Sequence, residues 1–588
     1  MKQILLRGGL PLLAIATLSG CIDDKYDLSD IDTTSQFTVK DLVLPINIEP
    51  IKLGDIIEIK DGEQIKEVTI NGETFYAVQE SGTFESDPIN IPGFMAAAPT
   101  LSPTSMKFVV NNTLRTSAKA PANAISIDME NPVEQPVRFS AAGIDPSILE
   151  LTDIYTDNFN ITLEFTLPSE ITAIADIELE NIMLDIPKGL TISSMVPDNC
   201  TYNDGEFKVP SLTFENGKAV LSLNATAINL PANNSGIDYN RHELAIDTKV
   251  DITAAQLMLT LKDNAELSTL SDVNVSIAYN ISPIDVNAVS GRIQYLLEGD
   301  ALNISPISLS SIPDFLSGDE TNLILANPQI YLSVNNPVAG ENLGYQTGLQ
   351  LTAVRENSDD KEFSLDNGYL RVGYDKGVTG PYNFCLSPEG PTNIPDEYVN
   401  PQAVPFSTLG NVIAGNGIPN SIRIKLVDPQ VYDQPVNKFK LNQNLAPLTG
   451  KWDFLAPLGL KNDSDAKIVY TKTVDGWSDD DVDAITINTL EVSLKVTNST
   501  PLAAQFTGYP IDKSGKQISG VEIKGADIPG NAQDVPVTIY ITGEVKNLDG
   551  ITFVATVTPN DSKPLSPDQS FTLSDIKAKV SGNYTKEL

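Results

Sequence analysis

Apolar and polar side chains alternate with a period of two along most of this chain, and this pattern limits its folds more than any other feature. Residues 161–167 and 490–497 alternate over their whole length, since every second residue is Ile, Leu, Val or Phe. Shorter stretches repeat the pattern at 273–277, 330–334, 422–426 and 537–541. Such strands bury one face and expose the other, as the strands of antiparallel sheets do. We therefore expect an all-β protein.

The alternating runs are separated by clusters of Pro, Gly, Asn and Asp, which are turn-forming residues. Helical periodicity is scarce, and we expect only short connector helices at 311–316 and 407–414. Many short strands with polar turns predict antiparallel, immunoglobulin-like β-sandwiches. Because a domain takes roughly 100–200 residues, the 588 residues require several such domains in tandem.

Changes in composition suggest where these units begin and end. Breaks near the Pro- and Ala-rich segment 92–103 and at Gly143 define the first of them. We expect β units at 44–142, 143–298, 299–445 and 446–588. In the last unit, Leu490, Val492, Leu494 and Val496 are expected to point into one core.

Two local patterns recur along the chain. Residues 325–331 are echoed 101 positions later by residues 426–432, a spacing close to the size of one immunoglobulin-like sandwich. This echo is explained either by duplication of a unit or by independent use of the same turn-forming residues. Strands are also expected to end at asparagines that precede a proline closely, because a residue before proline is held extended; these are Asn131, Asn336 and Asn498.

The first 20 residues have the features of a secretory signal. Lys2 and Arg7 precede an apolar run at 10–18, which is shorter than the roughly 20 residues that span a bilayer. The run ends in Leu-Ser-Gly-Cys, and this tetrapeptide resembles the lipobox of bacterial lipoproteins. The resemblance implies that residues 1–20 are removed and that Cys21 is acylated, so that the lipid anchors the protein in the outer membrane. The alternative is an ordinary signal peptide.

Residues 21–43 are expected to form the lipidated cysteine and a flexible acidic tether. Asp23 and Asp24, directly after Cys21, resemble the export signal of surface lipoproteins in Bacteroidota. That resemblance implies display on the cell surface, with a periplasm-facing anchor as the alternative. The C-terminal half of the chain also resembles lipoproteins of gut Bacteroidota in the general character of its sequence. This resemblance includes no catalytic motif.

The net charge excludes one class of partner. The chain has 39 basic and 77 acidic residues, which gives a net charge of −38. A field of this sign repels nucleic acid and anionic lipid headgroups. We therefore expect no nucleic-acid partner, and membrane contact only through the acyl anchor.

Residues suited to catalysis are sparse. His242 is the single histidine, which excludes multi-histidine metal sites. We expect it at the surface or at a strand end.

To act as a nucleophile, Cys200 would need His242 as a base and a lowered thiol pKa. The neighbouring Asp198 would instead raise that pKa. Cys200 and Cys385 are expected to be buried free thiols, with a disulfide as the alternative. A glycosidase pair of carboxylates stays open, because 77 acidic residues give no means of choosing one.

Few residues suggest a ligand site. Trp452 is expected in a strand core, whereas Trp477 lies in a turn sequence where it would be free to stack on a sugar. Clustered carboxylates in a loop suit calcium, and the candidates are Asp479, Asp481 and Asp483. A solvated acidic turn is the alternative.

These patterns favour a cell-envelope lipoprotein with a non-catalytic binding or structural role. Its expected partners are the membrane, through the lipid, and a protein or glycan at the cell surface, and no cofactor is expected. One alternative is a glycan-binding accessory lipoprotein of a nutrient-uptake system. Another is a glycoside hydrolase that uses a carboxylate pair.

Overall fold

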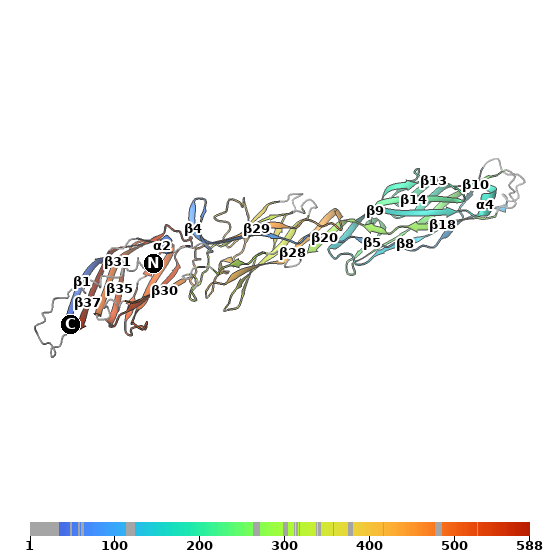
Figure 1. Ribbon diagram of the computed structural model, residues 1–588. Coiled ribbons are helices and arrows are strands. Elements are labelled where there is room, and N and C mark those ends of the chain that lie inside the picture. Colours follow the sequence, from blue (N-terminus) through green and yellow to red (C-terminus); the bar gives the residue numbers. More distant parts are fainter. Residues whose placement is uncertain are drawn as a thin grey trace.

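The computed structural model describes residues 34–46, 50–56, 59, 64–112, 124–262, 271–297, 304–310, 312, 316, 318–336, 338, 343–356, 358–373, 380–415, 417–476, 485–525 and 527–587. These residues form an all-β molecule with several separate antiparallel sheets, as the alternation predicts. Figure 1 shows a long rod in which three units follow one another. We call them the base, the middle unit and the distal unit.

The base contains the first and last strands of the chain. Its sheet has the order β1-β37-β31-β35-β33-β32-β36-β30, with β2 on β37 and β34 on β32. The strands are β1 (Thr34–Ile46), β2 (Ile51–Lys52), β30 (Ile468–Val474), β31 (Ile485–Asn498), β32 (Leu502–Ile511), β33 (Glu522–Lys524), β34 (Asp527–Ile528), β35 (Ala532–Val545), β36 (Gly550–Pro559) and β37 (Ser570–Glu587). Helix α2 (Leu53–Ile56) follows β2.

The middle unit has a six-stranded sheet of order β27-β26-β22-β29-β4-β3, in which only β26 and β27 pair in parallel. Its strands are β3 (Ile65–Ile70), β4 (Glu73–Glu85), β22 (Gln329–Asn335), β26 (Tyr382–Ser387), β27 (Gln402–Pro405) and β29 (Thr449–Pro457). The unit also contains β21 (Ile307–Ser308), β23 (Tyr345–Val354), β24 (Lys361–Ser364), β25 (Leu370–Val372) and most of β28 (Ser421–Lys440). Within the segment 407–414, where a short helix is expected, a single 3₁₀ turn, η5, covers Leu409–Asn411.

The distal unit holds the strands from β5 to β19. They are β5 (Phe94–Ala96), β6 (Thr104–Phe108), β7 (Ile125–Asp128), β8 (Pro136–Ala141), β9 (Ile148–Thr166), β10 (Ala175–Asp185), β11 (Leu190–Val196), β12 (Thr201–Asn203), β13 (Glu206–Thr213), β14 (Lys218–Asn229), β15 (Gly236–Asp238), β16 (Glu243–Lys249), β17 (Asp251–Leu261), β18 (Val273–Ile281) and β19 (Ile284–Val286). Two short helices, α4 (Ser169–Ile174) and η2 (Pro231–Asn233), lie in this unit.

A continuous hydrogen-bonded sheet joins the middle and distal units. The 20-residue β28 pairs with β23 through its first half and with β20 (Ala288–Leu296) through its second half. β20 in turn pairs with the first half of the 19-residue β9, and the second half of β9 pairs with β14 and β18. A 20-residue strand is about 65 Å long, so these strands run through the junction as rigid elements.

The chain runs out along the rod and then returns. Residues 86–91 lead away from the middle unit beside residues 442–448, which lead back, and three backbone hydrogen bonds of 2.8–2.9 Å join the two segments. The segment 44–142 alone supplies β2 to the base, β4 to the middle unit and β7 to the distal unit. The sheets therefore divide the chain differently from the expected limits at 142, 298 and 445, because each unit combines strands from distant parts of the sequence.

The strongest alternating run behaves as predicted. In β9, Ile161, Leu163 and Phe165 are at most 1% exposed and belong to the large hydrophobic cluster that extends from the middle unit into the distal unit. The run at 490–497 fits less well. Val496 in β31 is buried, but Leu490, Val492 and Leu494 are only half-buried. Leu490 packs against one small hydrophobic cluster of the base and Leu494 against another, so the run does not point into one core.

Two of the three predicted strand ends use their asparagine in the same way. The Asn336 amide, just beyond β22, donates to the carbonyls of Leu343 and Gly373 at 2.7 and 2.8 Å. The Asn498 amide, at the end of β31, donates to Leu502 O and Pro529 O at 2.8 and 3.0 Å. Asn131 is exposed. Both buried asparagines satisfy the backbone where a strand stops.

The echoed segments occupy different places in the fold. The first includes the start of β22 in the six-stranded sheet, and the second lies inside β28 of the eleven-stranded sheet.

Within the described ranges, no helix has both the length and the apolar character needed to cross a membrane.

Candidate functional site

A polar pocket lies on the six-stranded sheet of the middle unit, where β4, β29 and β22 run side by side. Its volume is about 550 Å3, within the usual range for small-molecule sites. The lining residues are Thr83, Phe84, Glu85, Ser333, Asn335, Thr449, Gly450 and Lys451.

Strand register arranges the polar lining residues in two rows. Lys451 on β29 lies opposite Thr83 on one neighbouring strand and opposite Ser333 on the other. In the next row, Thr449 lies between Glu85 and Asn335. Residues that are directly opposite one another share a face of the sheet, so all six side chains project from the same side.

Five of these six side chains have no side-chain hydrogen bond or ion pair with the residues that the structure describes. These five are Thr83, Glu85, Ser333, Asn335 and Thr449. Their hydroxyl, amide and carboxylate groups therefore keep their full hydrogen-bonding capacity.

Lys451 is the exception, and it links the pocket to a neighbouring loop. Its ammonium group donates to Glu397 Oε2 at 2.6 Å and lies 5.1 Å from the centroid of the Tyr398 ring. The Tyr398 hydroxyl donates to the buried carboxylate of Asp453, two residues along β29 from Lys451. These contacts attach residues 397–398 to the sheet beside the pocket.

The charges in this cluster affect one another. The hydrogen bond from Lys451 lowers the pKa of Glu397. Burial raises the pKa of Asp453, and the nearby charge of Glu397 raises it further. Burial also raises the pKa of the Tyr398 hydroxyl, so this group stays protonated and donates. Glu397 and Asp453 are neighbouring carboxylates, but each is already bonded, to Lys451 and Tyr398 respectively.

A second set of polar contacts holds the same loop. Tyr331 packs its ring 5.2 Å from that of Tyr398, and its hydroxyl oxygen lies 2.6 Å from Gln329 Oε1 and 2.7 Å from Thr392 O. The Thr392 backbone N–H donates to Gln329 Oε1 at 2.8 Å. Thr392 and Tyr398 of the loop are therefore both held against the strands of the sheet.

The sequence contained only an indirect signal for this pocket. Lys451 and Asp453 alternate with Trp452 and Phe454, which are buried as expected for a core strand. That alternation placed polar residues on one face of β29. It did not show that β4 and β22 flank this strand.

Most of the residues singled out in the sequence do not lie in this pocket. Cys21, Asp23, Asp24, Trp477 and the acidic residues Asp479, Asp481 and Asp483 fall outside the described residues. Among the described residues, no group of three or more His, Cys, Asp and Glu side chains is placed to hold a metal ion.

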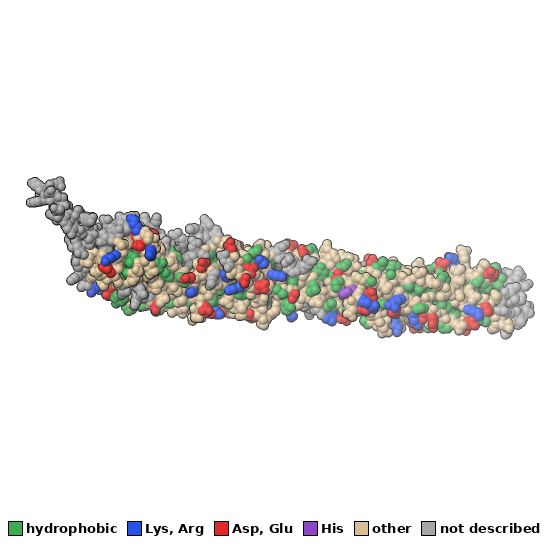
Figure 2. Space-filling model, turned by 90° about the horizontal axis from the view of Figure 1, so that it is seen from below, with side chains coloured by type: hydrophobic (Ala, Val, Ile, Leu, Met, Phe, Trp, Pro, Cys, Tyr) green, Lys and Arg blue, Asp and Glu red, His purple; other side chains and the backbone are tan. Residues whose placement is uncertain are grey.

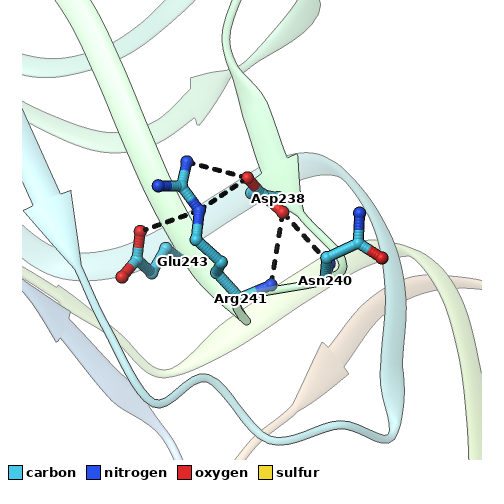
Figure 3. Close-up of polar contacts among 4 residues, drawn as sticks. All are labelled: Asp238, Asn240, Arg241 and Glu243. Atoms are coloured by element: carbon cyan, nitrogen blue, oxygen red, sulfur yellow. Dashed lines mark hydrogen bonds and ion pairs between the residues drawn. The ribbon is translucent and has the colours of Figure 1, made fainter.

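His242 lies in the turn that precedes β16, as the strand-end expectation requires. Its backbone has a positive φ of 51°, and its carbonyl accepts a hydrogen bond from Ile144 N. Figure 3 shows the turn around it, in which Arg241 lies between Asp238 and Glu243. The Arg241 Nε donates to Asp238 Oδ2 at 2.9 Å. These charged groups stabilise the turn.

Both cysteines of the described part are buried and free. Burial raises the pKa of each thiol to about 11, and Asp198 contributes to the shift at Cys200. Cys385 lies in the core beneath the loop at 388–401, next to Gln329 and Ser387. A thiol of such high pKa is a poor nucleophile.

We expect iodoacetamide to label neither thiol in the folded protein at pH 8, because only about one molecule in a thousand carries the thiolate at that pH. In guanidinium chloride both should react, since the pKa returns to about 8.5. Mass spectrometry of a Cys21→Ser chain would measure this. Rapid labelling of native Cys200 or Cys385, or a disulfide between them, would contradict the expectation.

Comparison with known proteins adds little. No family model matches the chain, and no curated protein matches it. One solved structure that aligns with it is the crystal structure of a "putative secreted protein" from Parabacteroides distasonis ATCC 8503. The alignment covers 50% of this chain and 89% of that chain, with 17% identity and a TM-score of 0.35. A likeness of this size assigns neither a family nor a function.

Proposed function

We propose that this protein is a lipid-anchored rod of the cell envelope that presents its distal unit away from the outer membrane, and that it acts by binding or as a structural element. The observation that carries the proposal is the pairing of β1 with β37. This pairing brings the first and last strands together in the base, whereas the strands of the distal unit lie at the opposite end of the rod (Figure 1).

The position of the base suits an anchored protein. β1 begins at Thr34, 13 residues after Cys21, so a lipid on that cysteine would hold the base close to the membrane. The shared strands β28, β20 and β9 resist bending, because bending would break their backbone ladders. The middle and distal units would then extend from the base as one stiff piece.

The surface charge supports an exposed location. Figure 2 shows Asp and Glu side chains all along the coloured part of the visible face, mixed with Lys and Arg. A net charge of −38 keeps such a molecule soluble and repels anionic lipid headgroups. Acylation, outer-membrane location and surface display are the parts of the proposal that rest on the signal sequence, on Cys21 and on the acidic residues that follow it.

The proposal is tested by following Cys21. Mass spectrometry of the mature N-terminus should show an acylated cysteine, and Cys21→Ser should release the protein from the membrane fraction almost completely, since the acyl chains supply the attachment. Protease added to intact cells should digest the wild-type rod.

Asp23→Ala with Asp24→Ala serves as the control for display. This variant should keep its lipid and its membrane attachment but resist protease, because it would face the periplasm. An unmodified N-terminus at another residue, or membrane retention of a Cys21→Ser protein whose signal has been removed, would refute the anchor.

The second candidate is a glycan-binding accessory lipoprotein of a nutrient-uptake system. The pocket on the six-stranded sheet favours it, since five polar side chains there have no hydrogen-bond or ion-pair partner among the described residues. A glycoside hydrolase ranks third, because Glu397 and Asp453 are bonded to Lys451 and Tyr398.

A further inference from the structure

We propose that the pocket on the six-stranded sheet binds a neutral, hydroxyl-rich ligand, and that an oligosaccharide is the chemical class it takes. The inference deepens the proposed binding role and rests on it. It assigns the ligand to the middle unit rather than to Trp477.

The lining groups match the chemistry of sugar hydroxyls. Thr83, Ser333 and Thr449 each offer a hydroxyl that donates and accepts, Asn335 offers an amide that does both, and Glu85 accepts. A sugar hydroxyl also donates and accepts, so each pairs with any of these groups. A ligand without hydroxyls would leave them unpaired.

The local charge favours a neutral ligand. Lys451 is the only cation among the lining residues, and Glu397 neutralises it at 2.6 Å. Glu85 has no cationic partner among the described residues. A carboxylate, sulfate or phosphate group would therefore be repelled both by the pocket and by the surrounding acidic protein.

The pocket is preorganised by the sheet beneath it. Neighbouring strands lie about 4.8 Å apart and successive residues on one face are about 7 Å apart, so the two rows present their polar groups over an area of roughly 10 by 7 Å. Between the two rows lie Phe84 and Gly450, whose backbone lines the pocket. The Phe84 ring points to the opposite face of the sheet and packs in the core, 8% exposed. A Cβ at Gly450 would overlap the Phe84 ring, so glycine is required there.

The test replaces two pocket hydroxyls with methyl groups of similar size, in the double variant Thr83→Val and Thr449→Val. Its matched control is Thr471→Val with Thr507→Val. These two exposed threonines lie in one row of the base sheet, on either side of Val554. Both variants change two strand threonines that are not buried, so thermal unfolding should be the same in each.

The probes are immobilised neutral oligosaccharides, namely maltohexaose, cellohexaose, xylohexaose and mannohexaose, with polygalacturonate and heparin as anionic comparisons. The full mature chain with Cys21→Ser should bind at least one neutral probe and neither anionic one. The pocket variant should bind that probe about tenfold more weakly or worse, and the control variant should bind it as the parent does.

Three results would overturn the inference: no neutral probe binds, an anionic probe alone binds, or both double variants weaken binding equally. None of them affects the anchoring experiment, which uses cells and Cys21. Loss of acylation with intact sugar binding would refute the rod's membrane role and leave the pocket assignment standing.

Discussion

Replacing Gly291 with valine should uncouple the distal unit from the middle unit. Gly291 lies in β20 at a bulge opposite β9, with φ of 150°. A Cβ there would overlap the Glu150 carbonyl oxygen and come 3.1 Å from Leu151 Cα. Backbone atoms cannot move far enough to relieve this clash without breaking the ladder, so Gly291→Val should cost roughly 2–5 kcal/mol.

Small-angle scattering and limited proteolysis would measure this loss. The variant should show a shorter average length and new cleavage near residues 286–297. Gly236→Val is the control, because Gly236 lies in β15 of the distal unit and a Cβ there would meet no other atom within 4 Å. An unchanged scattering curve for Gly291→Val would show that β20 does not hold the two units together.

Truncating Phe165 to alanine should destabilise the distal unit more than any surface change in it. Phe165 is fully buried in β9, opposite Ala219 of β14 and Ile277 of β18. Removing a buried phenylalanine ring costs about 3–5 kcal/mol. For a unit of this size the melting temperature should fall by roughly 6–20 °C, which calorimetry on the full chain would detect as an earlier transition.

Glu164→Ala tests whether the effect comes from burial. Glu164 is the preceding residue on the opposite face of β9, and it forms an exposed ion pair with Lys218. Exposed ion pairs contribute about 0–1 kcal/mol, so this variant should melt within a few degrees of the parent. Equal losses from the two substitutions would mean that the face assignment of β9 is wrong.

The candidate site shows how much of a binding pocket can be predicted from the sequence. The sequence predicted Trp452 in the core face of a strand, and both Trp452 and Phe454 of β29 are buried. Whether polar residues on such a face form a pocket depends on the neighbouring strands. Thr83 and Ser333 lie 368 and 118 positions from Lys451, and no local pattern connects them.

Local sequence patterns were enough to establish that this protein is built of β-strands, which residues of β9 face its core, and where two strands end at buried asparagines. These properties are local, because a period of two and a turn residue act within a few positions. The partners of each strand, in contrast, became known from the tertiary structure alone. Every strand edge offers the same N–H and C=O groups, so nothing in residues 34–46 specifies pairing with residues 570–587. The depth of burial is also decided by the tertiary structure. Alternation sets which way the Leu494 side chain points, but the layer packed against it sets how deeply it is buried, and here it is only half-buried.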